Sequence, residues 1–214
     1  MELIGPHQNQ PVAVTGVELS KAKKAMIMIH GRGASAQSIL GLSKEFNNTE
    51  DFVFLAPQAS GHTWYPYSFL VPTENNQPGI NSGLQAISDI IEKLNEHEIS
   101  SENIFLLGFS QGACLASEFV ARTPLKYAGL IALSGGLIGE SIDLDSYSGD
   151  LKQTLIFMGC SDIDAHIPKE RVNESADVFE KLHAKVIKKL YPGMGHLVNE
   201  DEIQHIQQLI DSLN

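Results

Sequence analysis

The sequence predicts a protein of the α/β class, with a mostly parallel central sheet and helices on both faces of it. Two patterns lead to this prediction. Short, continuous apolar runs recur along the chain, and segments with helical spacing of apolar residues lie between them. The chain has 214 residues, a length that favours one domain over residues 1–214 with a substantial core.

Six apolar runs are expected to form the sheet. Five of them are continuous rather than alternating, which is typical of strands that are covered on both faces. These five are 26–29, 52–55, 104–107, 130–133 and 155–158. The sixth run, 186–191, is interrupted by Lys188 and Lys189, so it suits a strand near the sheet edge.

Apolar residues at helical spacing predict four helices between these strands. They lie at about 82–96, from about 111 to 120, around 172–182 and around 203–210. Near the start of the chain, the apolar residues of 12–19 flank Thr15-Gly16 and predict a hairpin that leads into the sheet. The connection 57–81 has no clear period but is rich in aromatic residues, and long loops of this kind are usually functional.

Composition excludes several classes of protein. With 15 basic and 26 acidic residues, the formal net charge is −11, which argues against a nucleic-acid partner. No apolar run approaches the ~20 residues of a membrane span, and residues 1–10 are polar, without the pattern of a signal peptide. Two cysteines, Cys114 and Cys160, make no disulfide framework. We therefore expect a cytoplasmic protein.

The strongest chemical signal is the string Gly108-Phe109-Ser110-Gln111-Gly112, which fits the pattern G-x-S-x-G. It follows one predicted strand directly and precedes a predicted helix, which is the context of a nucleophile elbow. In such an elbow, a sharp turn exposes the serine and the glycines relieve crowding around it. The alternative is a loop in which the serine only caps a helix. The context favours Ser110 as a nucleophile.

A serine nucleophile needs a base, which is commonly a histidine oriented by an acid. Of the eight histidines, His196 lies in a glycine-rich loop at the end of the last predicted strand, and it is the best candidate. The acid should follow an earlier strand. Both Asp162 and Asp164 follow the run 155–158, and spacing alone does not choose between them. The unused aspartate would brace or cap the loop.

The string His30-Gly31-Arg32-Gly33 closes the first strong strand. Acyl transfer needs donors for the oxyanion, and in this architecture these are the amide after the nucleophile and an amide of such an early loop. The backbone amides of Gln111 and Arg32 are the candidates. The alternative is an ordinary turn at the end of a strand. No pair of histidines has a helix-type metal-ligand spacing, so we expect neither a metal nor an organic cofactor.

Together, these strings and Gly193-Met194-Gly195-His196 resemble the phospholipase/carboxylesterase group of the α/β-hydrolase superfamily, which includes the acyl-protein thioesterases. They follow the order Ser…Asp…His of that family and span most of the chain. The resemblance implies an α/β-hydrolase fold, and no insertion is long enough for a lid domain. It also implies a serine carboxylesterase that hydrolyses esters or thioesters of small to medium acyl groups through an acyl-enzyme.

The resemblance further suggests roles for individual residues. The family's acid loop reads Asp-Pro-x-x-Pro with the first residue catalytic. This register falls on Asp164, with Ala165 in place of the first proline, and Asp162 is the alternative. Trp64-Tyr65 looks like the tryptophan-containing loop of the family. We expect the substrate site to include His30, Gly31, Trp64 and Tyr65, within an open cleft walled by residues 62–69.

Several rival functions stay open on the sequence. Arg32 stands where thioesterases often have leucine, which weighs against a long, lipid-like substrate, yet a lysophospholipase or an acyl-protein thioesterase is an alternative. A dienelactone-hydrolase-like enzyme would have cysteine at position 110. A non-catalytic binding protein would commonly have lost one of the three catalytic residues. The expected partner is a small ester or thioester, and because small enzymes of this group often dimerise, a homodimer is possible.

Overall fold

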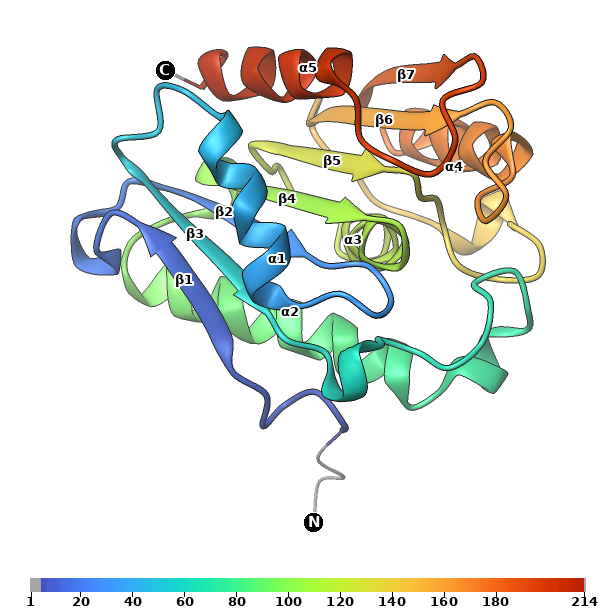
Figure 1. The fold of residues 1–214 in the computed structure, drawn as a ribbon, viewed down its shortest axis with the longest axis horizontal. Coiled ribbons are helices and arrows are strands. Elements are labelled where there is room, and N and C mark those ends of the chain that lie inside the picture. Colours follow the sequence, from blue (N-terminus) through green and yellow to red (C-terminus); the bar gives the residue numbers. More distant parts are fainter. Residues whose placement is uncertain (1–4, 214) are drawn as a thin grey trace.

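The structure, a computed structural model, describes residues 5–213 and is built around a seven-stranded sheet. The strand order is β1-β3-β2-β4-β5-β6-β7; β1 runs antiparallel to β3 and all other neighbours are parallel. Residues 1–4 of the polar N-terminal segment lie outside the described residues. The strands, labelled in Figure 1, are β1 (Val12–Gly16), β2 (Lys24–Ile29), β3 (Phe52–Pro57), β4 (Ile104–Phe109), β5 (Gly129–Leu133), β6 (Leu155–Ser161) and β7 (Lys185–Tyr191).

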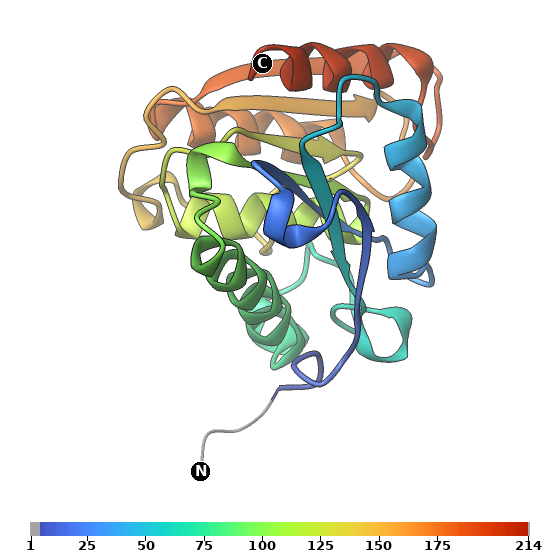
Figure 2. The same cartoon turned by 90° about the vertical axis from the view of Figure 1, so that its left-hand side faces the viewer.

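Helices cover both faces of this sheet, as the sequence predicts. On one face lie α1 (Ala36–Leu40) and α5 (Glu200–Asp211), which share a buried apolar cluster with that side of the sheet. On the other face lie α2 (Gly79–Glu96), α3 (Gln111–Arg122) and α4 (Lys169–Lys181), with a larger cluster. Figure 2 shows α1 and α2 on opposite sides of the sheet. The central strands are therefore buried on both faces, which explains their continuous apolar runs.

The sheet edges differ from the expectation at one end. β7 is an edge strand with mostly partly exposed or exposed residues, as its lysines predict. The prediction of an N-terminal hairpin is wrong. β1 pairs with β3, and the residues after Gly16 include a short 3₁₀ turn, Leu19–Lys21. Gly16 has a φ of +91°, a conformation that bends the chain at the point where a hairpin would need a second strand.

Two segments without a sequence signal complete the fold. Helix α1 has five residues, too few for a helical period, and it begins with a capping box between Ser35 and Ser38. The long connection between β3 and α2 has only two 3₁₀ turns, Ser60–His62 and Thr73–Asn76. None of the helices within residues 5–213 has the length and apolar character of a membrane span, and no separate lid domain stands over the sheet in this part of the chain.

Candidate active site

Ser110 occupies the tight turn between β4 and α3. Its φ of +55° and ψ of −121° place it in a region that residues with a side chain rarely adopt. The two glycines of the motif explain how the turn is possible. A Cβ at Gly108 would collide with the backbone of Gly112, and a Cβ at Gly112 would collide with the carbonyl oxygen of Ile29. The G-x-S-x-G pattern thus follows from the close packing of α3 on the ends of β4 and β2.

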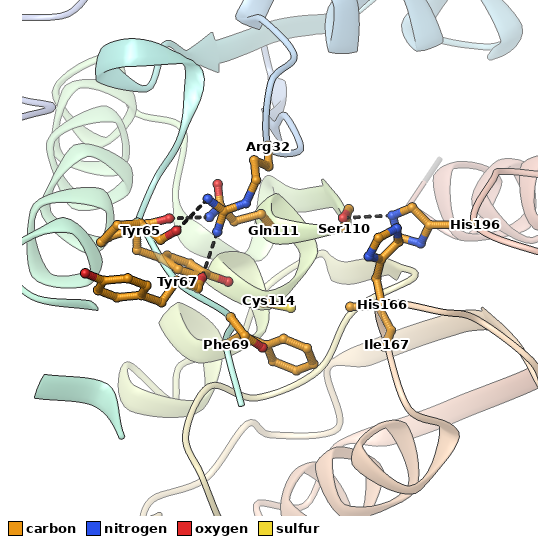
Figure 3. A pocket seen from close by; sticks show the side chains of 12 residues that line it. Arg32, Tyr65, Tyr67, Phe69, Ser110, Gln111, Cys114, His166, Ile167 and His196 are labelled. Atoms are coloured by element: carbon orange, nitrogen blue, oxygen red, sulfur yellow. Dashed lines mark hydrogen bonds between the residues drawn. The ribbon is translucent and has the colours of Figure 1, made fainter. Parts of the chain in front are cut away.

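Three side chains from different strand ends, those of Ser110, His196 and Asp164, meet beside this turn, and Figure 3 shows the first two. Nε2 of His196 lies 2.9 Å from Oγ of Ser110, and Nδ1 of His196 lies 2.7 Å from Oδ2 of Asp164. The carboxylate of Asp164 is fully buried, whereas the imidazole of His196 is partly exposed. A proton on Nδ1 donated to Asp164 leaves Nε2 free to accept a hydrogen bond from the serine hydroxyl.

The environment of Asp164 keeps it ionised. Burial by itself would raise the pKa of its carboxyl, but hydrogen bonds from His196 and from the backbone amides of His166 and Ile167 outweigh burial and hold the pKa below its ordinary value. The two amides donate to Oδ1 at 2.8 and 3.1 Å, so Oδ2 is left for the histidine. A charged acid in this position stabilises a protonated imidazole.

Asp162 has the other use that the sequence left open for an aspartate of this loop. Its Oδ1 accepts a hydrogen bond from the amide of Gly193 at 2.8 Å, and Oγ of Ser161 accepts one from the amide of Gly195 at 3.1 Å. Both glycines have positive φ, of 66° and 79°. The end of β6 therefore holds the loop that carries His196, and the structure brings Asp164 rather than Asp162 to the imidazole.

The two backbone amides that the sequence suggests as oxyanion donors have no partner within the described part of the protein. Within residues 5–213, no protein acceptor takes a hydrogen bond from the amide of Gln111 or that of Arg32. Gly31 brings the second of these close to the elbow, since a Cβ there would lie 3.3 Å from the carbonyl oxygen of Phe109 and 3.4 Å from Cβ of Ser110. Gly31 thus allows a close approach of two backbones, and it is not among the residues that line the cavity described below.

A cavity of about 420 Å³ opens beside Ser110 and His196. Its other lining residues come from the loop after β2, the long connection, the first turn of α3 and the loop after β6 (Figure 3): Arg32, Tyr65, Pro66, Tyr67, Ser68, Phe69, Gln111, Cys114, His166 and Ile167. The wall combines aromatic rings with polar side chains, an arrangement that occurs in small-molecule sites. Burial raises the pKa of the Cys114 thiol to about 12, so this sulfur is uncharged.

The residues expected at the substrate site divide into two groups. Tyr65 lines the cavity, but Trp64 and His30 do not, because both are fully buried beneath it. The indole Nε1 of Trp64 donates to the carbonyl of His30 at 2.9 Å, and Nε2 of His30 accepts a hydrogen bond from the amide of Ala59 at 3.1 Å. Burial lowers the pKa of His30, so it is a neutral core residue.

Three lining residues were missed from the sequence. Cys114 lies four positions after Ser110, so it is on the same face of α3 one turn further on. His166 and Ile167 follow Asp164 directly, and the His166 and His196 rings are 4.9 Å apart in an edge-to-face arrangement. The spacing from a known active-site residue could have indicated all three. In the part of the chain that the structure describes, no three side chains of His, Cys, Asp or Glu are grouped to hold a metal ion.

The mostly parallel sheet has helices on both faces, and the strained Ser110 follows its central strand, β4. Together with the Ser–His–Asp contacts, these features define the class: this is an α/β hydrolase. A family model described as phospholipase/carboxylesterase matches residues 12–214, and the chain belongs to this family. The prediction made from its motifs is thereby confirmed.

Similar proteins agree with this assignment. The crystal structure of a phospholipase/carboxylesterase from Dyadobacter fermentans is 40% identical, with a TM-score of 0.91, and the match covers 95% of this chain and 97% of that one. Acyl-protein thioesterase 1 of Kluyveromyces lactis is 31% identical over 208 residues, 88% of this chain and 91% of the relative. A probable carboxylesterase of Arabidopsis thaliana, SOBER1-like, is 26% identical over 204 residues, 88% of this chain and 78% of the relative. The chain is therefore a hydrolase that acts on esters or thioesters.

Proposed function

We propose that this protein hydrolyses esters or thioesters of small to medium acyl groups, with Ser110 as nucleophile, His196 as base and Asp164 as the acid that orients the base. The observation that carries the proposal is the pair of hydrogen bonds of 2.9 and 2.7 Å that His196 makes with Ser110 and Asp164. They join a hydroxyl, a base and a charged acid in the order that nucleophilic catalysis needs.

The reaction proceeds in two steps. His196 takes the hydroxyl proton of Ser110 as Oγ attacks the acyl carbonyl, and the oxyanion is held by the amides of Arg32 and Gln111. The imidazolium then gives the proton to the leaving alcohol or thiol as the bond to it breaks. Water attacks the resulting acyl-enzyme with His196 again as base, which releases the acid and restores Ser110. No metal or organic cofactor is required.

The shape of the cavity supports a compact acyl group. Its wall contains the rings of Tyr65 and Phe69, both almost fully buried, and Ile167 is its one branched aliphatic side chain. A rigid wall favours groups of defined shape over long flexible chains. The thioesterase relative from Kluyveromyces lactis makes thioesters a second candidate substrate class, so both leaving groups belong in the test.

Two measurements test the proposal. A fluorophosphonate probe should label the native protein and fail to label Ser110→Ala, whose kcat should fall by about 10⁴ to 10⁶ with folding intact. A panel of p-nitrophenyl esters from acetate to palmitate, with a matched acyl-thioester series, should show the highest kcat/KM between acetate and hexanoate. Near-normal turnover in Ser110→Ala, or a preference for palmitate, would contradict it.

We also infer a cytoplasmic location. Cys114 and Cys160 are both free and buried, and burial raises the pKa of both thiols to about 12. Such thiols behave as small apolar core residues, a use of cysteine that suits a reducing compartment.

A further inference from the structure

Arg32 differs from the other two arginines of the chain in its partners. Arg122 is ion-paired with Glu118, and Arg171 is ion-paired with Glu174 at 2.9 Å. Within residues 5–213, no carboxylate forms an ion pair with Arg32, although acidic residues outnumber basic ones by 26 to 15. A cation that is unpaired in a strongly acidic protein is open to an anion from outside.

The guanidinium of Arg32 is nevertheless held in a fixed position. Its Nη1 donates to the carbonyl of Pro66 at 2.9 Å, and its Nη2 donates to the carbonyl of Tyr67 at 2.7 Å. Its central carbon lies 6.0 Å from the centre of the Tyr65 ring. Figure 3 shows the side chain reaching toward the loop that carries these tyrosines, on the side of Ser110 away from His196.

These contacts leave part of the binding capacity of the guanidinium unused. Two of its five N–H donors are engaged by carbonyls, which do not neutralise its charge, and three remain. Because the side chain is already ordered, a ligand that binds it does not bear the full cost of fixing a flexible arginine. The side chain is also exposed at the cavity rather than covered by the protein.

The rest of the cavity wall does not offset this charge. Arg32 is the one side chain of fixed charge among the lining residues, and none of them is an aspartate or a glutamate. The carboxylate of Asp164 is buried behind His196 and is engaged by that imidazole and by two backbone amides. The cavity wall therefore combines aromatic, apolar and polar groups with one side chain of fixed positive charge.

We propose that the preferred substrates carry a carboxylate in addition to the reacting ester or thioester, and that the guanidinium of Arg32 binds this carboxylate. The inference rests on the hydrolase function proposed above and names the substrate class within it. Two chemical sources supply such a group: the half-ester of a dicarboxylic acid, with the carboxylate on the acyl part, or an ester of a hydroxy acid, with the carboxylate on the leaving part.

The experiment compares substrates that differ in the carboxylate alone. On the acyl side these are mono-p-nitrophenyl adipate and p-nitrophenyl hexanoate, which have the same number of acyl carbons. On the leaving side they are the butyrate esters of 4-hydroxybenzoate and of methyl 4-hydroxybenzoate. The measured quantity is the ratio of kcat/KM for the anionic ester to that for its neutral partner, after subtraction of the rate with Ser110→Ala protein.

Native protein, Arg32→Lys and Arg32→Gln are compared by this ratio. The ratio is used because the amide of residue 32 also faces the oxyanion, and because its side chain holds the wall, so absolute rates will change in any variant. For either the acyl-side pair or the leaving-side pair of esters, Arg32→Gln should lower the ratio by about five- to tenfold. This is the size expected for loss of a partly exposed charged hydrogen bond. Arg32→Lys, which keeps the charge, should stay within about threefold of the native ratio.

A measurement on the native protein covers the case in which a variant does not fold. Raising NaCl from about 10 mM to about 1 M shortens the Debye length from about 30 Å to about 3 Å, and it should lower the same ratio several-fold. The inference is overturned if the neutral esters are hydrolysed but Arg32→Gln leaves both ratios unchanged. It is also overturned if both ratios of the native protein are insensitive to salt. If none of the four esters is hydrolysed, the result would instead count against the proposed hydrolase function with these substrates.

Discussion

The two sides of the cavity are held in place in different ways. On the side of His196, the loops after β6 and β7 contact each other directly through Asp162, Ser161 and the amides of Gly193 and Gly195. These two strands are neighbours in the sheet, so the contacts span a short distance. On the aromatic side, the connection after β3 has no strand neighbour. It is held by individual side chains, including its own Asn76, and by the backbone amides of Gly33 and Gly139.

Three polar side chains make hydrogen bonds that hold the loop backbone on the aromatic side. Gln111 accepts a hydrogen bond from the amide of Trp64 and donates to the carbonyl of Tyr65, both at 2.8 Å. Asn76, fully buried, bonds the amide of Tyr67 and the carbonyl of Ser68, also at 2.8 Å. Arg32 holds the carbonyls of residues 66 and 67.

The comparison separates the reacting groups from the substrate wall. The sheet fixes Ser110, Asp164 and His196, because each follows a strand at the same edge of the sheet. The wall depends on a few side chains that contact loop backbone, so a single substitution can reshape it without changing the sheet. Changes on the histidine side should therefore act on kcat, and changes on the exposed part of the aromatic side on KM.

The largest effect is expected from Asp164→Asn. An asparagine cannot hold His196 in the tautomer that accepts the serine proton, so kcat should fall by about 10⁴. Asp162→Asn should cost about tenfold or less, because its amide oxygen can still accept the hydrogen bond from Gly193. Steady-state kinetics on p-nitrophenyl butyrate give both values. The reverse ranking would transfer the role of the acid to Asp162.

The next largest effect is expected from Trp64→Ala. Because the indole is fully buried and its Nε1 donates to an internal carbonyl, its removal should lower the free energy of unfolding by about 3–5 kcal/mol. Tyr67→Ala is the matched control: that ring is 60% exposed, so stability should change by less than about 0.5 kcal/mol while KM rises. Urea denaturation beside kinetics separates the two. A Trp64→Ala protein of native stability with a raised KM would place the indole at the substrate instead.

The burial of Trp64 could not be predicted from the sequence. Strands β2 to β7 and four of the helices could be predicted, because continuous apolar runs mark buried strands. That Ser110, His196 and one of two aspartates meet could also be predicted, because all of them follow strand ends, but spacing alone did not choose between Asp162 and Asp164. The structure of the connection after β3 could not be predicted. It follows from contacts of single polar side chains with loop backbone, such as those of Gln111 with Trp64 and Tyr65, and these leave no periodic signal. Its aromatic residues indicated a wall but not which rings face inward.

The smallest expected effect concerns Glu202, which supports the histidine side from the first turn of α5. Asn199 lies three residues after His196. Oε2 of Glu202 accepts a hydrogen bond from the amide of Asn199 at 2.9 Å, and the amide of Glu202 donates one to the side chain of Asn199. The carboxyl is fully buried, Oε1 has no hydrogen-bond partner within residues 5–213 and it packs on Gly159. Burial raises the pKa of Glu202 from 4.5 to about 7.

The raised pKa of Glu202 sets the sign of its effect on the pH dependence of stability. The folded protein holds the proton of Glu202 more tightly than the unfolded chain. The contribution of Glu202 to stability is therefore full below about pH 4.5 and is lost as the pH rises toward 7. At 1.36 kcal/mol for each pKa unit, the loss is at most about 3 kcal/mol. Glu202→Gln keeps an acceptor for Asn199 without the charge, so it should be more stable than the native protein at pH 8 and similar to it at pH 4.5.

Urea unfolding at pH 4.5, 6 and 8 measures this difference, with Glu200→Gln as the control, because Glu200 is exposed on the same turn. Buried histidines such as His30 titrate in the same range, but native and variant proteins share them, so the difference between the two isolates Glu202. Equal pH dependence in both would show that Glu202 is solvated when folded. A flatter curve in the variant would show that the histidine side, unlike the aromatic wall, keeps a buried carboxylate at a cost in stability to hold the loop beside His196.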